Sequence, residues 1–126
     1  SYIKNNGEIV PHTDNVNKFL NLMLYFPDFE TNNDNIENSK KEELYGTQFW
    51  SSKEKFTASE QSIDDYNSSN KSVFRNRNQK LYRTPFVGNR LYGFIRNDYS
   101  WHSVEPINIS SNYIRKSINI KFIYVN

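Results

Sequence analysis

Short strand-like stretches separated by turn sequences are the feature that most limits the folds open to this chain. Residues 19–26 form a continuous apolar run that ends at Pro27, which is typical of a strand buried on both faces. Residues 114–125 alternate between apolar and polar side chains over much of their length. Aromatic residues, which favour pleated surfaces, make up 16% of the chain. Because no convincing amphipathic helix accompanies these strands, the pattern predicts an all-β barrel or sandwich.

The other predicted strands are shorter and are bounded by Gly, Asn or Pro. Two lie within residues 1–12, broken by a turn at residues 5–7, and the second of them covers residues 8–12. The rest cover residues 44–50, 72–75, 80–87, 90–96 and 101–104. Gly46 marks a bulge or a close approach of two backbones. The polar residues 28–43 predict a solvated loop, and residues 51–71 predict a second polar stretch with room for a helical turn.

Length and composition exclude several classes of protein. With 126 residues, the chain is expected to form a single domain over residues 1–126. There is no cysteine, which excludes disulfides, thiolate catalysis and cysteine-based zinc sites. No apolar run reaches the length of a membrane span and no signal peptide is visible, so we expect a soluble cytoplasmic protein without a membrane partner.

The only two histidines indicate a metal site. His12 lies in Pro-His-Thr-Asp, one residue away from Asp14, and His102 lies in Ser-Trp-His-Ser-Val near the other end of the chain. In an extended strand, residues two apart point to the same side, so His12 and Asp14 can face one metal while a neighbouring strand supplies His102. Two imidazoles and a carboxylate are the ligand set of mononuclear non-haem iron. His-x-Asp alone is common and a Trp-His pair is usually core packing, but their combination is far more specific.

A second pair of residues predicts recognition of a carboxylate. Strand alternation places Arg115 and Ser117 on one face and Lys116 on the other. An arginine side chain grips a carboxylate bidentately, and a serine hydroxyl can donate to the same group. The ordinary alternative is that Arg115 pairs with a surface acid. Its position on the strand after His102 favours a functional role.

Taken together, these segments resemble the 2-oxoglutarate and Fe(II)-dependent dioxygenases, particularly their prolyl-hydroxylase-like and phytanoyl-hydroxylase-like branches. The resemblance covers almost the whole chain and rests on residues 11–25, 45–49, 89–95, 100–106 and 115–117. It implies a double-stranded β-helix, a jelly-roll barrel of cupin-like type. It also implies hydroxylation of a small-molecule or peptidyl substrate, with release of succinate and carbon dioxide and with ascorbate as a possible addition in vitro.

The resemblance assigns roles to individual residues. The residues that would hold Fe(II) are His12, Asp14 and His102. The residues that would bind the co-substrate 2-oxoglutarate are Arg115, Ser117, Tyr25 and Asn21. For Tyr25 an ordinary core position is an equal alternative, and Asn21 is a candidate because it shares strand parity with Tyr25.

Other functions stay open at this stage. A cupin-like barrel can bind a metal or a small ligand without oxygen chemistry, so a non-enzymatic binding module is the main alternative. The basic residues between 71 and 96 raise nucleic-acid binding, but charged stretches are usually solvated faces and the acidic segment before them offsets the total. Related enzymes usually carry helices before the first metal motif, whereas eleven residues precede His12 here. A sheet face lacking that buttress would be exposed, and dimerisation would cover it.

Overall fold

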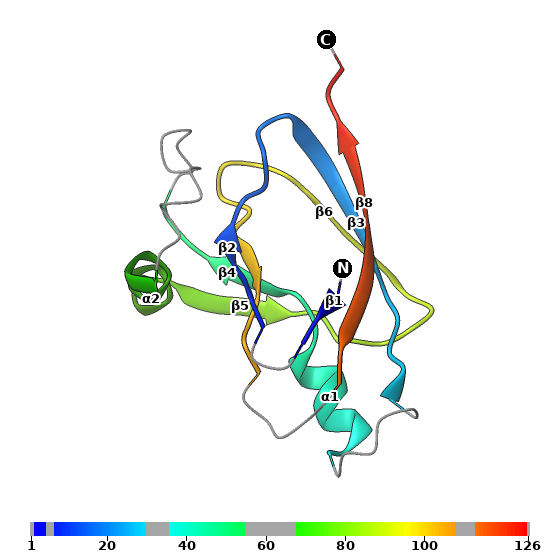
Figure 1. The fold of residues 1–126 in the computed structure, drawn as a ribbon. Coiled ribbons are helices and arrows are strands. Elements are labelled where there is room, and N and C mark those ends of the chain that lie inside the picture. The colour runs from blue at the N-terminus through cyan, green and yellow to red at the C-terminus, as the bar shows by residue number, and fades with distance from the viewer. Residues whose placement is uncertain (1, 5–6, 30–35, 55–67, 108–112, 126) are drawn as a thin grey trace.

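Two antiparallel four-stranded sheets make up most of the structure (Figure 1). The computed structural model describes residues 2–4, 7–29, 36–54, 68–107 and 113–125, with only the backbone described for residues 68–72. The first sheet contains, in spatial order, β1 (Tyr2–Ile3), β8 (Arg115–Ile123), β3 (Lys18–Tyr25) and β6 (Leu91–Ile95). The second contains β2 (Ile9–His12), β7 (His102–Val104), β4 (Gln48–Ser51) and β5 (Gln79–Arg83). The prediction of a β-rich fold is therefore confirmed.

The inner faces of the two sheets meet in an aromatic core. The Phe49 ring on β4 and the Phe94 ring on β6 lie 5.3 Å apart, edge to face, and so join one sheet to the other. Met23 and Tyr25 of β3 and Phe86 are buried in the same cluster. Such ring pairs add stability beyond the area they bury. Successive strands also alternate between the sheets, except that β4 and β5 are neighbours in one sheet, so residues distant in sequence line the same interior.

The prediction that residues 19–26 are buried on both faces is wrong. The inward positions of β3, at Asn21, Met23 and Tyr25, are buried, whereas the outward positions are only half-buried. Those outward side chains belong to a face on which large apolar residues of the neighbouring strands are also exposed, including Ile95 at 71% and Ile118 at 51%. The continuous apolar run therefore reflects an outer sheet face that is apolar but partly exposed, and not a strand covered on both faces.

Residues 28–43 were expected to be a loop, but they contain most of helix α1 (Asn38–Leu44). The expected strand at residues 44–50 consequently begins later, at Gln48. The helix is anchored by Lys41, which is 1% exposed and has its ammonium 5.4 Å from the ring centroids of Phe29 and Tyr113. Because this anchor is a cation–π contact made by a charged residue, hydrophobic periodicity could not indicate the helix.

The short strand expected at residues 72–75 is also wrong, because these residues lie within helix α2 (Ser68–Arg77). Phe74 attaches this helix to the second sheet, because the centroid of its ring lies 5.6 Å from that of Trp50 and 4.8 Å from that of Trp101.

Much of the polar stretch predicted for residues 51–71 lies outside the described residues, at 55–67. Within the described residues, no helix combines the length and the apolar character of a membrane span.

Gly46 lies where two backbones approach closely, as predicted. A Cβ atom at this position would lie 1.6 Å from the carbonyl oxygen of Thr84. The approach is fixed by two hydrogen bonds, from the Thr84 amide to the Thr47 carbonyl at 3.0 Å and from the Thr47 amide to the Thr84 hydroxyl at 2.9 Å. Of the turn predicted at residues 5–7, residues 5 and 6 lie outside the described residues, while the Gly7 amide donates to the Lys4 carbonyl at 2.9 Å.

Candidate metal centre

The two histidines lie directly opposite each other on paired strands. Antiparallel pairing of β2 with β7 places His12 beside His102, and their ring centroids are 4.3 Å apart. Cross-strand neighbours project to the same face of a sheet. The two imidazoles, separated by most of the chain in sequence, therefore enter the interior side by side.

Asp14 reaches the two histidines because of its backbone conformation, and not through the alternation of side chains along a strand. Strand β2 ends at His12, and Asp14 adopts a left-handed backbone conformation with φ of 70°. This conformation is uncommon for residues other than glycine and persists where surrounding contacts enforce it. The neighbouring Thr13 is held by Arg96, whose Nη2 donates to the Thr13 hydroxyl at 3.3 Å, while the Ser100 hydroxyl donates to the Asn97 carbonyl at 2.8 Å and lies 3.5 Å from the Thr13 carbonyl.

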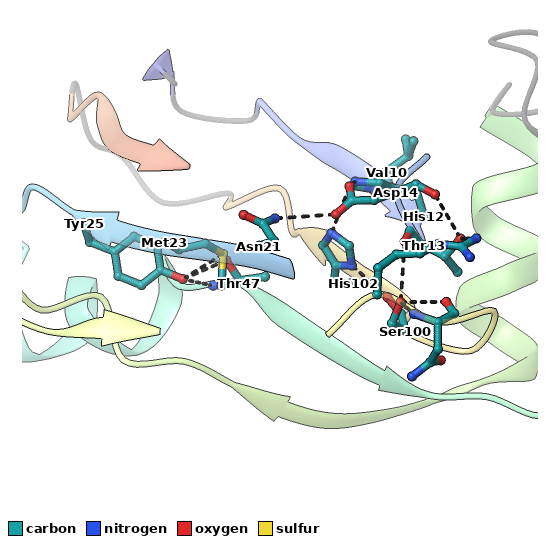
Figure 2. Close-up of polar contacts among 12 residues, drawn as sticks. Val10, His12, Thr13, Asp14, Asn21, Met23, Tyr25, Thr47, Ser100 and His102 are labelled. Atoms are coloured by element: carbon teal, nitrogen blue, oxygen red, sulfur yellow. Dashed lines mark hydrogen bonds and ion pairs between the residues drawn. The ribbon is translucent and has the colours of Figure 1, made fainter. Parts of the chain in front are cut away.

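The three predicted ligand groups converge on one point (Figure 2). The Asp14 Oδ1 lies 2.9 Å from the His12 Nε2 and 3.5 Å from the His102 Nε2. One ligand atom from each residue lies within 4.8 Å of the others, so the group could hold a metal ion. The structure thus brings together all three residues singled out from the sequence.

Contacts on the far side of each ring fix which nitrogen faces the centre. The Nδ1 of His12 is 2.8 Å from the Val10 carbonyl oxygen, and the Nδ1 of His102 is 2.8 Å from the Ser100 carbonyl oxygen. A carbonyl oxygen can only accept, so in the neutral ring the proton is on Nδ1 and Nε2 presents a lone pair. Metal-binding histidines are usually oriented in this way by a second hydrogen bond.

The Asp14 carboxylate at the centre is held in its ionised form by the two histidines. Burial alone would raise the pKa of Asp14, but hydrogen bonds and attraction from His102 and His12 outweigh it and hold that pKa well below its usual range. Burial lowers the pKa of His102, which favours its neutral form. In the metal-free protein the ionised carboxylate is balanced by a proton on an imidazole Nε2, as the 2.9 Å contact with His12 allows, and a metal ion bound between the three groups would take the place of that proton.

Asn21 of β3 supports the centre from the other sheet. Its Nδ2 donates to the Asp14 Oδ2 at 3.5 Å. Its Oδ1 is buried, and no atom in the described part of the chain hydrogen-bonds to it. A buried amide oxygen without a partner is a costly arrangement that fits a site completed by a ligand or by water.

A cavity of 140 Å³ connects the metal centre to Arg115 and Ser117. The metal-ligand group and Asn21 contribute to its lining, and the Arg115–Ser117 pair lines the same space. The metal-ligand group and the Arg115–Ser117 pair lie apart along the sheet. In the pairing of β8 with β3, Ser117 lies opposite Tyr25 and Lys121 lies opposite Asn21. The cavity therefore has a metal-ligand end and an arginine end.

Arg115 is a buried cation with no anionic partner among the described residues. It is 2% exposed, its Nη1 donates to the Ser117 hydroxyl at 3.2 Å, and its Nε donates to the Tyr45 carbonyl. No carboxylate of the described residues lies within ion-pair distance of it. Burial lowers its pKa, which measures the cost of keeping the guanidinium charged there. A cation held in this way can bind an anion.

Tyr25 lies beside Arg115, in the core position that was the alternative for it. Its hydroxyl is engaged by the Thr47 and Thr84 hydroxyls, each at 2.7 Å. Its ring lies under the guanidinium of Arg115, 5.2 Å from ring centroid to Cζ, and it is not among the residues that line the cavity. Tyr25 therefore supports Arg115 and does not face the cavity.

The sequence reasoning missed seven of the residues that line the cavity: Ile9, Met23, Thr47, Ser103, Val104, Asn119 and Lys121. For Asn119 and Lys121 a signal existed, because they share strand parity with Arg115 and Ser117. Thr47 lies between a helix and a strand, where no periodicity applies.

In comparisons with known proteins, no protein-family model, curated protein or solved structure matches this chain.

Proposed function

We propose that this chain is an Fe(II)- and 2-oxoglutarate-dependent oxygenase that hydroxylates a small-molecule or peptidyl substrate. The observation that carries the proposal is a single cavity lined by two different sites: the His12–Asp14–His102 group and the buried Arg115–Ser117 pair. A metal-binding module would need only the first. A buried arginine without a carboxylate partner is explained by a ligand that supplies one.

The donor set favours iron. Two imidazole nitrogens and one carboxylate oxygen form the ligand triad of non-haem Fe(II) oxygenases and leave coordination positions open. Iron bound there would couple oxidative decarboxylation of 2-oxoglutarate to the activation of oxygen and hydroxylation of the substrate. The protein contributes the three ligands, the orienting carbonyls of Val10 and Ser100, and a buried anion site.

The shape of the cavity favours a 2-oxo acid with a second carboxylate. Asn21 at the metal end and Tyr25 at the arginine end are four residues apart on β3, roughly 14 Å along the strand. The side chains of Arg115 and of the metal ligands reach into this interval from both ends. An elongated ligand that chelates at one end and carries an anionic group at the other suits that arrangement.

The strand order supports the proposed barrel type. Eight strands in two sheets, with the chain crossing between sheets at nearly every step, agree with a double-stranded β-helix of the jelly-roll class. In that arrangement early and late strands become neighbours, as β2 and β7 are here.

The test is succinate production by purified protein supplied with Fe(II), ascorbate and 2-oxoglutarate under air. We expect slow succinate release in the wild type, none in Asp14→Ala, and strong loss in Arg115→Met. Lys116→Met is the matched control, since Lys116 lies next to Arg115 but is half-exposed and points to the other face. Iron binding that 2-oxoglutarate leaves unchanged, with no succinate, would instead indicate a metal-binding module.

A further inference from the structure

The inward face of β8 is polar over its first four positions, and only Ile123 at its end is apolar. Arg115, Ser117, Asn119 and Lys121 follow one another at every second position, and all four line the cavity. Arg115 and Ser117 are buried, whereas Asn119 and Lys121 are exposed, so the row runs from the closed end of the cavity to its mouth. Lys121 lies opposite Asn21, the residue that hydrogen-bonds Asp14, so the mouth opens beside the metal centre.

A bulge in β3 turns a second lysine toward the same face as this row, next to Lys121. Lys18 pairs with Ile123 and Leu20 pairs with Phe122, so Phe19 is an extra residue in the register. Bulges redirect side chains and occur preferentially beside active sites. Because paired residues project to the same face and Ile123 shares parity with Lys121, the bulge turns Lys18 inward.

The aromatic contacts of Phe19 agree with this reading of the register. Its ring lies 6.1 Å from the Phe122 ring and 5.1 Å from the Tyr124 ring. Phe122 has the parity of the outward-facing residues of β8, so Phe19 packs on the outer side. Without the bulge, simple alternation would have placed Phe19 inside and Lys18 outside.

The two lysines form a like-charge pair. The pKa of Lys18 is lowered by burial and by the neighbouring Lys121, with a smaller opposing attraction from Asp14. In the described part of the chain, no carboxylate lies within ion-pair distance of Lys18 or Lys121. Two adjacent ammonium groups beside a cavity therefore present positive charge that the attraction of Asp14 offsets only in part, and an oxyanion would offset the remainder.

We propose that Lys18 and Lys121 bind the anionic group of the substrate, so that the substrate is a small molecule bearing a carboxylate or phosphate close to the carbon that is hydroxylated. This inference rests on the proposed function, because it takes the cavity as the reaction site. The co-substrate carboxylate is assigned to Arg115 at the opposite end, which leaves the two lysines free for the substrate. A neutral peptide segment offers no partner for this pair.

The proposal can be tested with acetate as the probe and acetamide as its neutral counterpart. Mn(II) bound at the metal centre accelerates the relaxation of nearby methyl protons, with a steep dependence on distance. The measurement uses protein loaded with Mn(II) and 2-oxoglutarate, so that the arginine end is filled. The variants are the Lys18→Met/Lys121→Met double substitution, Lys121→Arg as a conservative rescue, and Lys116→Met as a control on the opposite face of β8.

We expect acetate to show a saturable relaxation effect in the wild type that acetamide lacks. In the double variant acetate should bind about tenfold more weakly or worse, because charge-assisted hydrogen bonds are lost. Lys121→Arg and Lys116→Met should keep most of the effect. Equal effects of acetate and acetamide would overturn the proposal, and so would an acetate effect that survives in the double variant, since acetate would then bind the metal directly.

Failure of the proposed function has a separate signature. If Mn(II) binds but 2-oxoglutarate does not, the oxygenase proposal fails, while the acetate comparison can still be made with the Mn(II) protein alone. If Mn(II) does not bind, the ¹⁵Nζ signals of Lys18 and Lys121 report on acetate directly. Saturable shifts of both signals, absent with acetamide, would support the anion site, and their absence would refute it.

Discussion

Replacing Arg115 with methionine should separate ligand binding from stability. Methionine keeps an unbranched apolar stem but lacks the guanidinium, with its charge and its hydrogen-bond donors. Removing one partner of a buried charged pair costs about 2–5 kcal/mol of binding, so 2-oxoglutarate affinity should fall by roughly 30-fold to 4,000-fold. Mn(II) affinity in the absence of 2-oxoglutarate should not change, because Arg115 is not a metal ligand.

The stability of the ligand-free variant should change little or increase. The substitution leaves the Tyr45 carbonyl without its donor, which costs about 1–3 kcal/mol, and removes cation–π contacts with Tyr25 and Phe86 worth about 0.5–2 kcal/mol. Against this stands the desolvation of a guanidinium that is 2% exposed and has no carboxylate partner in the described residues, a penalty of several kcal/mol. These contributions oppose each other and are of similar size.

The assay is urea unfolding of the ligand-free protein together with titration by 2-oxoglutarate in the presence of Mn(II). Unchanged 2-oxoglutarate affinity in Arg115→Met would refute the role assigned to the arginine. A loss of more than about 5 kcal/mol of unfolding free energy, beyond the combined cost of the broken contacts, would show that Arg115 is a structural residue instead.

Three further predictions follow from the geometry of the site and of the sheet crossing. Asp14→Gly should abolish Mn(II) binding and lower the unfolding free energy of the metal-free protein at neutral pH, because the ionised carboxylate that His12 and His102 stabilise is lost and relief of the left-handed backbone at φ 70° offsets only part of that loss; an unchanged or higher unfolding free energy in urea would contradict this. Gly46→Ala should cost about 3 kcal/mol or more, because its Cβ would meet the Thr84 carbonyl at 1.6 Å, and an unshifted melting temperature would be the opposing result. Mn(II) affinity should fall on acidification, since imidazole binds metal only when neutral. Because burial lowers the pKa of His102 from 6.5, the loss of Mn(II) affinity caused by protonation of His102 should begin below that pH. A decline in affinity that is complete by pH 7 in a series of calorimetric titrations would be inconsistent with this burial.

The strands were predictable because their signal is local. Apolar runs and alternation in residues 19–26 and 114–125 reflect which face of a sheet is buried, and the sheets follow from them. The helices were not predictable in this way. Helix α1 is anchored by the buried Lys41 over two aromatic rings, and α2 by Phe74 against two tryptophans, contacts that form only in the folded chain.

The candidate metal centre shows the same division between local and tertiary causes. Residue types alone indicated His12, Asp14 and His102, and the pairing of β2 with β7 brings the histidines together. The left-handed backbone at Asp14 and the bulge that turns Lys18 inward both break the alternation rule. Such departures depend on tertiary contacts, and both occur beside the cavity.

The most direct test of the central claim is an equilibrium titration with Mn(II), followed by the electron paramagnetic resonance signal of the free ion. We expect one tightly bound ion in the wild type and its loss in His12→Ala, Asp14→Ala and His102→Ala, each of which should remain folded. Asn21→Ser, which removes a contact to Asp14 but no ligand, should bind with affinity reduced by about tenfold to a hundredfold. Binding in the three ligand variants that equals the wild type would show that these side chains do not form a metal site.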